Sequence, residues 1–283
     1  MKEDINQWDL IIESENSLFD LKLDEVWHYR DLLGLLVKRD FVAFYKQTIL
    51  GPVWFFVQPL FTMVMYIFVF GKLAGLSTDN IPGPLFYLTG ITAWTYFAEC
   101  LTKTATVFRD NANIFGKVYF PRLIIPLSIV VSNLVRFGVQ LLLLLIAMVY
   151  FAINGGGFTP SLYILLFPVL LVLMAIQGLG LGMIISAMTT KYRDLALLLT
   201  FGIQLMMYAT TVVYPLSSLH GKMHTLVALN PMTYVIEGMR KGLLGKGSFD
   251  GWGLLYITVC SLICLLLGLF VFNKVEKTFV DTV

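Results

Sequence analysis

Long apolar runs with few or no charges alternate with short polar segments along most of this chain. The first run covers residues 49–70, and at about 1.5 Å per helical residue it reaches across the roughly 30 Å hydrocarbon core of a bilayer. The same length test places five further runs, at residues 85–108, 123–153, 162–188, 195–214 and 253–273. This pattern predicts an all-α integral membrane protein with six transmembrane helices.

Basic residues mark one side of these runs. Lys38, Arg39 and Lys46 directly precede the first run, and the connections after the second and fourth runs also carry Lys and Arg. By contrast, the connection at residues 71–84 carries a single Lys, and that at residues 154–161 has no charge. Because Lys and Arg gather on the cytoplasmic side of membrane spans, both termini are predicted to be cytoplasmic.

The segment before the first run is different in character. Between residues 24 and 44 apolar residues recur near helical spacing among charges, which predicts an amphipathic helix at the membrane surface. Residues 1–23 are polar with short alternations, typical of a small hairpin or of disorder, and we expect no signal peptide there. We therefore divide the chain into a cytoplasmic N-terminal segment (1–48), a six-span domain (49–273) and a cytoplasmic tail (274–283).

The connection between the fifth and sixth runs, residues 215–252, is too long for a simple turn. Its middle part is apolar, and Asn230 followed by Pro231 is a helix start signal. This part is too short and too polar to span a bilayer. It is interpreted as re-entrant helices on the external side, and the alternative is an interfacial helix lying flat.

Composition supports the membrane assignment. Of the 283 residues 58% are hydrophobic and only 13% are charged, whereas about a quarter of the residues in soluble proteins carry charge. Nucleic-acid binding has no support in this composition. The three cysteines, Cys100, Cys260 and Cys264, all lie in apolar stretches, where they are interpreted as small packing residues and not as a disulfide or metal framework.

The sequence does not match the residue patterns of a zinc protease site or of a phosphate loop. His220 and His224 are spaced like HxxxH but without the adjacent Glu of a zinc protease, and the string at residues 242–248 lacks the glycine spacing of a phosphate loop. We therefore expect no catalytic site, no metal and no cofactor bound by this chain. If ATP drives the protein, another chain must supply the ATP site.

Inserting a charged residue within a membrane span costs free energy, roughly 2.5 to 3.5 kcal/mol for a central Arg. Such a residue should therefore face protein or water. Arg136 is such a residue, in a stripe that follows four-residue intervals through Ser128, Ser132 and Gln140. Glu99 lies at a comparable depth in the preceding run. Two interpretations remain open: Glu99 and Arg136 pair to hold two helices together, or the stripe borders a polar pathway.

Two further runs carry polar and aromatic faces, which suggest a lumen shared between them, although ordinary interhelical hydrogen bonds would use the same residue types. The first run contributes Gln58, Thr62 and Tyr66, and the fifth contributes Thr200, Gln204, Tyr208 and Thr211. In the fourth run Gly178, Gly182 and Ser186 form a row of small residues that predicts close helix packing.

Four stretches together carry a resemblance to a known family. They are YRDLLGLLVKRDFVAFYKQTILGPVWFFVQPL (29–60), RDNANIFGKVYFPRLIIPLS (109–128), TTKYRDL (189–195) and VVYPLSSL with LNPMTYVIEGMR (212–240). The chain resembles the membrane subunit of bacterial polysaccharide ABC exporters, the ABC-2 type permeases that move O-antigen, capsule or teichoic acid. The resemblance implies a homodimer with two separate cytoplasmic ATPase subunits, which bind ATP and Mg²⁺, and a channel in the bacterial inner membrane for a lipid-linked glycan of the undecaprenyl type.

The resemblance also assigns expected roles to residues. The helix at 24–44 is similar to a cytoplasmic gate helix, with Trp27, Tyr29, Arg30, Lys38, Arg39 and Lys46 as candidates. Two loops are similar to ATPase-coupling segments and contain Arg109, Asp110, Asn111, Asn113, Lys117, Lys191, Arg193 and Asp194. The external gate candidates are Asn230, Pro231, Tyr234, Glu237 and Arg240. The candidates for the substrate channel are Gln58, Thr62, Tyr66, Arg136, Gln140, Gln204, Tyr208 and Thr211.

The expected function is export of a lipid-linked polysaccharide, most specifically O-antigen, and two other functions are alternatives to it. An ABC-2 exporter of a smaller lipid or drug would not need a wide, aromatic-lined channel. A membrane-bound glycan-modifying enzyme would need clustered His or carboxylate residues at a membrane face, and the sequence pattern offers none.

Overall fold

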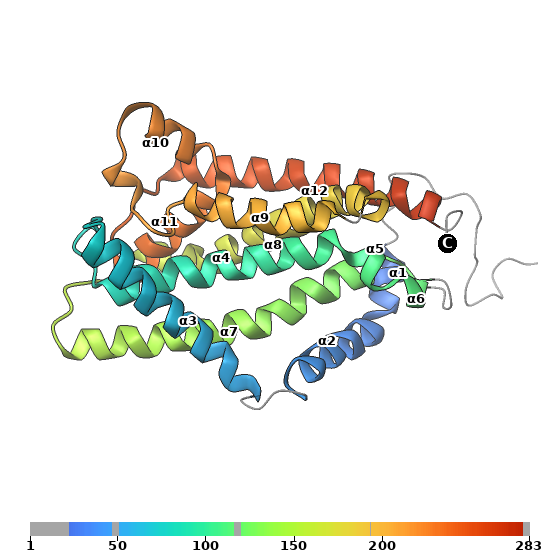
Figure 1. Ribbon diagram of the computed structural model, residues 1–283, viewed down its shortest axis with the longest axis horizontal. Helices are drawn as coiled ribbons and strands as arrows, with labels where there is room; N and C mark the ends of the chain where they lie inside the picture. Colours follow the sequence, from blue (N-terminus) through green and yellow to red (C-terminus); the bar gives the residue numbers. More distant parts are fainter. Residues whose placement is uncertain (1–22, 47–50, 116–119, 193, 280–283) are drawn as a thin grey trace, which may run out of the picture.

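The computed structural model describes residues 23–46, 51–115, 120–192 and 194–279, and every regular element in these ranges is a helix (Figure 1). The expected all-α fold is thereby confirmed. The elements in chain order are α1 Leu23–His28, α2 Arg30–Tyr45, η2 Gly51–Val53, α3 Trp54–Tyr66, η3 Ile67–Leu73, α4 Gly83–Ala105, α5 Val107–Asp110, α6 Ala112–Phe115, α7 Ile124–Ile153, η4 Leu162–Leu166, α8 Phe167–Lys191, α9 Leu195–Tyr208, η5 Leu216–Ser218, α10 Gly221–Ala228, α11 Pro231–Leu244 and α12 Gly251–Phe279.

Four of the described helical segments are long and apolar enough to cross a membrane: Trp54–Leu73, Ile124–Ile153, Leu162–Lys191 and Gly251–Val275. They correspond to the first, third, fourth and sixth expected spans. The first begins later than expected, at Trp54, because Gly51–Val53 forms a separate 3-10 turn. Beyond Tyr66 it continues as a π-helix, η3.

The second and fifth expected spans differ from these four. Helix α4 is long, but it lies at the centre of the bundle against α3, α7, α8, α9 and α11. Most of its residues are buried by protein, so it can carry Thr, Tyr and charged residues that a lipid-facing helix could not. Helix α9 ends at Tyr208, six residues earlier than expected, where the chain enters a series of turns. The presence of six membrane spans stays a prediction.

Glycines bring α4, α8 and α12 into close contact. A Cβ atom on Gly178 would lie 2.9 Å from Cys100 Cβ on α4, and one on Gly182 would lie 2.6 Å from Thr104 Cβ. The packing role predicted for this row is therefore confirmed. On the opposite side of α8 a Cβ on Gly180 would lie 2.6 Å from the Cys264 backbone of α12, a contact that the row of small residues did not predict. The cysteines are free thiols, and Cys100 is buried.

The expected helix at residues 24–44 is divided in the structure. Tyr29, with φ −89° and ψ 20°, separates α1 from α2, so the prediction of one continuous helix is corrected. Its apolar side does face protein, because α2 packs on α7 and Leu36 is buried in a cluster with Ile125 and Phe108. The hairpin considered for residues 1–23 lies outside the described residues, apart from Leu23 at the start of α1.

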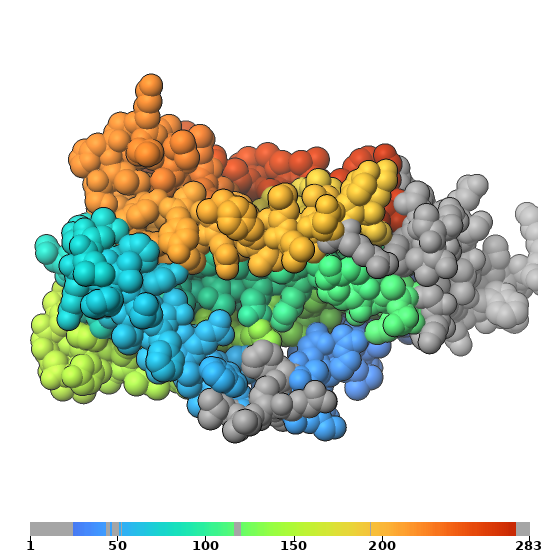
Figure 2. Space-filling view, in the orientation of Figure 1, coloured from blue at the N-terminus to red at the C-terminus, as the bar shows by residue number. Residues whose placement is uncertain are grey.

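The connection between α9 and α12, which is expected to be external, folds back into the bundle. Helix α11 packs against α4, α8, α12 and η4, and most of its residues are buried. Helix α10, in contrast, is largely exposed and protrudes at one end of the molecule in Figure 2. The helix that begins at Pro231 is thus covered by protein on nearly all sides instead of resting on a surface. Its position relative to a bilayer stays a prediction.

Candidate functional site

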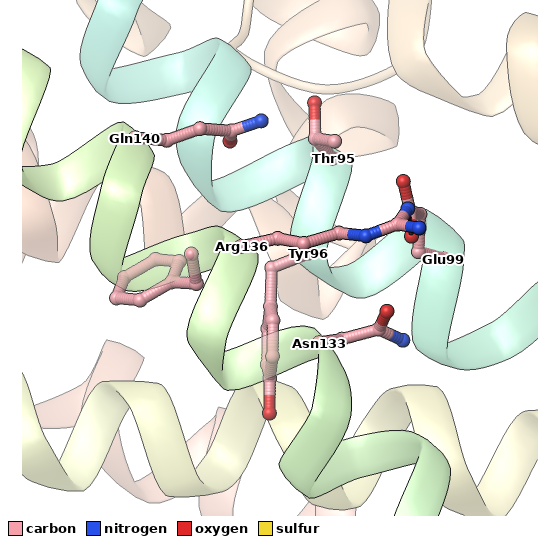
Figure 3. A pocket seen from close by; sticks show the side chains of 7 residues that line it. Thr95, Tyr96, Glu99, Asn133, Arg136 and Gln140 are labelled. Carbon is pink, nitrogen blue, oxygen red and sulfur yellow. Dashed lines mark hydrogen bonds and ion pairs between the residues drawn. The ribbon is translucent and has the colours of Figure 1, made fainter. Parts of the chain in front are cut away.

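A polar pocket lies between α4 and α7 (Figure 3). The pocket is small and partly open, with room for about one water molecule between the side chains as they stand. Its lining residues are Thr95, Tyr96 and Glu99 from α4 and Asn133, Arg136, Phe137 and Gln140 from α7. Most of the surrounding helix surfaces are apolar, so the pocket gathers the polar groups of two adjacent helices.

The charged groups of this pocket contact one another. Arg136 Nη1 donates to Glu99 Oε2, and Lys103 Nζ lies 3.2 Å from the same oxygen. Lys103 also donates to Asn133 Oδ1 at 3.1 Å. The Arg136 guanidinium lies over the Phe55 ring of α3, 5.2 Å from its centroid. The predicted pairing of Glu99 with Arg136 is therefore confirmed, and the pair connects α4, α7 and the start of α3.

The rest of the predicted stripe on α7 is divided between two environments. Gln140 lines the pocket, and its buried amide makes no hydrogen bond to another described residue. Ser128 is buried and donates to the Ile125 carbonyl of its own helix at 2.8 Å. Ser132 Oγ is buried without a partner among the described residues. Only the Arg136 and Gln140 part of the stripe reaches the pocket.

The C-terminal ends of α3 and α9 meet η3 and the N-terminal part of α4 in an aromatic cluster. Tyr66 Oη donates to Met207 Sδ at 3.3 Å, and the Tyr66 ring lies 6.0 Å from that of Tyr87. Phe70 lies 5.3 Å from Tyr66 and 6.4 Å from Tyr208. Two of the faces predicted from the first and fifth runs are thus brought together in the structure.

Other residues predicted for these faces have different surroundings. Thr62 and Thr200 hydroxyls donate to carbonyls of their own helices, while Gln58 and Gln204 are exposed. Thr211 is fully buried and donates to the Thr233 carbonyl of α11 at 3.4 Å. This differs from the expectation of a channel-lining residue, because the chain leaves the helix after Tyr208.

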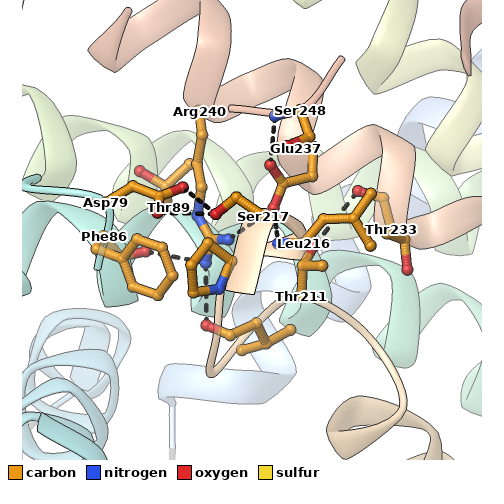
Figure 4. Close-up of polar contacts among 12 residues, drawn as sticks. Asp79, Phe86, Thr89, Thr211, Leu216, Ser217, Thr233, Glu237, Arg240 and Ser248 are labelled. Atoms are coloured by element: carbon orange, nitrogen blue, oxygen red, sulfur yellow. Dashed lines mark hydrogen bonds and ion pairs between the residues drawn. The ribbon is translucent and has the colours of Figure 1, made fainter. Parts of the chain in front are cut away.

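The described part of the external connection is held by a buried ion pair (Figure 4). Glu237 and Arg240 lie one turn apart on α11, with side chains only 0% and 1% exposed, and Nη1 donates to Oε1 at 3.2 Å. Arg240 Nη2 donates to the Val212 carbonyl at 3.0 Å and to the Phe86 carbonyl at 3.4 Å. The guanidinium also lies 3.5 Å from the centroid of the Phe86 ring.

Glu237 completes this arrangement on its other side. Its carboxylate accepts from the Ser248 backbone N–H at 2.8 Å and from that of Leu216 at 3.4 Å. Burial lowers the pKa of the Arg240 guanidinium to about 10, and the adjacent Glu237 carboxylate opposes this effect, so Arg240 remains charged at neutral pH. One ion pair therefore connects α11 to α4, to the segment after α9 and to the segment before α12.

Local sequence explains how α11 is placed. Asn230 is its N-cap and accepts from Met232 N–H at 3.1 Å, Pro231 occupies the first helical position, and Gly245 ends the helix with φ +73°. The Tyr234 ring lies 5.7 Å from that of Tyr256 on α12. The predicted start of this helix at Asn230 and Pro231 is confirmed.

Sequence reasoning missed the contacts that join the loop after η3 to the external connection. Ser217 Oγ donates to the Asp79 carboxylate at 2.8 Å, and Lys246 Nζ donates to the Asn80 carbonyl at 3.1 Å. Asp79 and Asn80 have positive φ angles of 54° and 56°. The adjacent Asp and Asn are a turn signal, because these residues tolerate the left-handed region.

The opposite end of the bundle carries the residues expected to couple to an ATPase. Arg109 and Asp110 on α5 are exposed and pair with each other at 2.9 Å, and Asp110 also accepts from Thr106 at 2.6 Å. Asn111 donates to the Val107 carbonyl at 3.0 Å, and Asn113 is exposed. Helix α5 contacts α8, whose last residue, Lys191, is exposed, as is Asp194. Lys117 and Arg193 lie outside the described residues.

The candidate gate residues lie on the side of α1 and α2 that is mostly exposed. Trp27 is 72% exposed, with the Arg30 guanidinium 5.8 Å from its ring centroid. Arg39 pairs with Asp40 at 2.8 Å. Tyr29 is half-buried, and Lys38 and Lys46 are exposed.

The long apolar helices are those of a membrane protein, and comparison with known proteins identifies its family. The family described as ABC-2 type transporter matches residues 31–244. This chain belongs to that family. It is a membrane subunit of a transporter and not an enzyme, and membership implies association with an ABC ATPase. The family assigned from the sequence motifs is confirmed.

Individual relatives are similar over nearly their whole length. The O-antigen export system permease protein RfbA of Myxococcus xanthus is 29% identical over 92% of this chain and 98% of its own length. A protein of the same name from Klebsiella pneumoniae is 30% identical over 89% of this chain and 94% of its own. The polysialic acid transport protein KpsM of Escherichia coli is 22% identical over 81% of this chain and 87% of its own.

Proposed function

We propose that this chain is the permease of an ATP-driven exporter that moves a lipid-linked polysaccharide, most specifically O-antigen, across the bacterial inner membrane. The similarity to O-antigen export permeases at about 30% identity carries this proposal, since it covers nearly the full length of both chains. The similarity to a polysialic acid transport protein is lower, and this favours O-antigen over capsule as the substrate class.

The proposed exporter contains two copies of this chain, each with six membrane spans and with external re-entrant helices. Helices α3 and α9 lie on the face shown in Figure 2. These two helices carry large apolar side chains that are exposed in the single chain, such as Phe61 (69% exposed) on α3 and Leu197 (78% exposed) on α9. A second copy would bury this face and enclose a channel between the two subunits. A glycan then has a continuous path without contact with lipid tails.

The proposed path follows residues that the structure places at two levels. Arg136 and Gln140 lie in the pocket between α4 and α7, while Tyr66 and Tyr208 belong to the aromatic cluster at the outer ends of α3 and α9. Aromatic rings offer apolar faces on which sugar rings can slide, with polar groups at their edges for hydrogen bonds. Gln58, Thr62 and Gln204 complete the proposed lining.

The proposed gates stand at the two ends of this path. Helices α1 and α2 form the cytoplasmic gate, with exposed basic residues Lys38 and Arg39 near its surface. Helix α11 forms the external gate, and the Glu237–Arg240 pair holds it against α4. ATP and Mg²⁺ bind to the partner ATPase, which contacts the α5–α6 segment and the loop after α8. Closure of the ATPase on ATP moves these segments and thereby the spans.

Deletion of the gene tests this function directly. The expected result is loss of surface O-antigen together with accumulation of lipid-linked glycan on the cytoplasmic face of the inner membrane. Expression of the chain in the deletion strain should reverse both changes. Unchanged surface glycan, with normal levels of the lipid-linked precursor, would refute the proposal. A matched strain with an inactive partner ATPase should reproduce the deletion.

A further inference from the structure

Two cations converge on one carboxylate oxygen in the pocket between α4 and α7 (Figure 3). Arg136 Nη1 and Lys103 Nζ both contact Glu99 Oε2, so the cluster holds two positive charges for one negative charge. Each of the three side chains retains exposure, at 20% for Arg136, 30% for Glu99 and 41% for Lys103. The cluster is therefore accessible.

A second feature of the pocket is independent of this charge cluster. Gln140 is 93% buried, since its exposure is 7%, and its amide lines the pocket without a hydrogen bond to another described residue. A ligand oxygen in the pocket would satisfy this amide, and the Thr95 hydroxyl lines the same space.

We propose that this pocket binds a phosphate group of the lipid carrier that bears the glycan, an inference that rests on the proposed export of a lipid-linked polysaccharide. Arg136 and Lys103 bind the phosphate oxygens, and Gln140 donates to one of them. Glu99 occupies the anion position when no carrier is present. The carboxylate thus keeps the two cations in place and competes with the arriving phosphate.

Measured from the ends of its two helices, the pocket lies deeper than the headgroup region of a lipid. Glu99 lies six residues before Ala105, the end of α4 that leads into α5, and this corresponds to about 9 Å of helix. The polar headgroup region of a bilayer is roughly 5 to 8 Å thick on each side. Arg136 lies twelve residues after Ile124, the start of α7, which corresponds to about 18 Å of helix. A phosphate in this pocket would therefore have left the headgroup region and entered the proposed path of the carrier.

The site can be tested by ligand binding to the full-length chain together with its ATPase, in nanodiscs of phosphatidylcholine. The probes are a polyprenyl diphosphate and, in parallel, soluble inorganic diphosphate. Arg136→Gln is expected to weaken binding of the lipid about tenfold, the effect of losing one charge-assisted hydrogen bond, and Arg136→Lys should weaken it less. Lys222→Gln, an exposed cation on α10, is the matched control and should leave affinity unchanged.

Two further variants separate a binding site from a simple tie between helices. Glu99→Gln removes the competing anion and should tighten binding of the polyprenyl diphosphate by about threefold or more, whereas a structural role predicts weaker binding and a lower melting temperature. Gln140→Leu should weaken binding severalfold while the melting temperature stays the same or rises, because the amide has no described protein partner to lose.

Each remaining outcome has one meaning. If Glu99→Gln and Arg136→Gln both lower stability and neither changes affinity selectively, the pocket is only a helix contact and the proposal is overturned. If soluble diphosphate binds as tightly as the lipid and responds to the same variants, the lipid carrier is the wrong ligand. If gene deletion abolishes surface glycan but the variants bind the polyprenyl diphosphate as tightly as the unchanged chain, the pocket is refuted as the binding site while the export function is supported.

Discussion

Arg240 and Glu237 form an ion pair that is buried on all sides, one turn apart on α11, and each also binds backbone groups of segments distant in sequence. Arg240 reaches the carbonyls of Phe86 and Val212, and Glu237 accepts from Ser248. Buried charges are stable only when paired and hydrogen-bonded. The position of α11 against α4 therefore depends on both members of the pair.

The losses of stability on removing each partner of this pair should not add. Arg240→Met leaves the Glu237 carboxylate buried and unpaired, and should lower the stability of the chain by about 3 to 5 kcal/mol. The double variant Glu237→Met with Arg240→Met should be less destabilised than the sum of the single variants. The measurement is a double-mutant cycle on denaturant-induced unfolding in detergent, with Lys222→Met on exposed α10 as the control. Additive effects would contradict a coupled pair.

Helix contacts along α8 give a second prediction. A Cβ on Gly182 would lie 2.6 Å from Thr104 Cβ, so Gly182→Ala should overpack this contact and lower stability by about 1 to 3 kcal/mol. Gly138 on α7 has nothing within 4 Å of such a Cβ, and Gly138→Ala should be neutral or stabilise by about 0.5 to 1 kcal/mol. Thermal unfolding of the two variants in the same detergent compares them. Equal losses would refute the close-packing account.

The apolar runs predicted several helices closely. Helix α7 begins at Ile124, one residue after the expected start, and ends at Ile153 as expected, because a helix that crosses a membrane must be predominantly apolar along its length. The same reasoning is weaker for α4, which is covered by other helices and is free to carry Glu99 and Lys103. Hydropathy therefore identifies helices that face lipid well, and is less informative for a helix such as α4 that is covered by other helices of the protein.

The candidate site was predictable where its residues share a depth. A pair of Arg136 and Glu99 was one of two interpretations that their positions within two adjacent runs allow, since each charge needs a partner in an apolar surrounding. The contact of Arg240 with Phe86 joins residues 154 positions apart, and no local spacing indicates such a contact. The packing of Phe55 on Arg136 was likewise hidden, because it depends on how α3 crosses α7.

Membrane orientation gives a third prediction. With Cys100, Cys260 and Cys264 replaced, a Lys222→Cys variant should react with a membrane-impermeant maleimide in intact spheroplasts, because the proposed arrangement puts α10 on the external side. A Lys191→Cys variant should react only after the membrane is opened, because positive loops remain in the cytoplasm. Labelling of Lys191→Cys in intact spheroplasts would contradict the proposed six-span arrangement.

Contact with the ATPase gives a fourth prediction. Arg109→Glu combined with Asp110→Lys reverses an exposed pair whose own contribution to stability is small, at most about 1 kcal/mol. The chain should insert and fold normally, while recovery of the partner ATPase on co-purification should fall more than about tenfold. Charge reversal at the other end of the molecule, Lys222→Glu, is the control. Full retention of the ATPase and of export would remove α5 from the coupling interface.

Reconstitution is the sharpest test of ATP-driven movement of a lipid-linked glycan by this chain and its ATPase. The chain and its ATPase are placed in proteoliposomes with lipid-linked O-antigen on the outer face, and glycan protected from an added glycosidase is measured with and without ATP and Mg²⁺. We predict that protected glycan increases only with ATP and Mg²⁺, and only when both proteins are present. ATP hydrolysis by the intact complex without any gain in protected glycan would contradict the account.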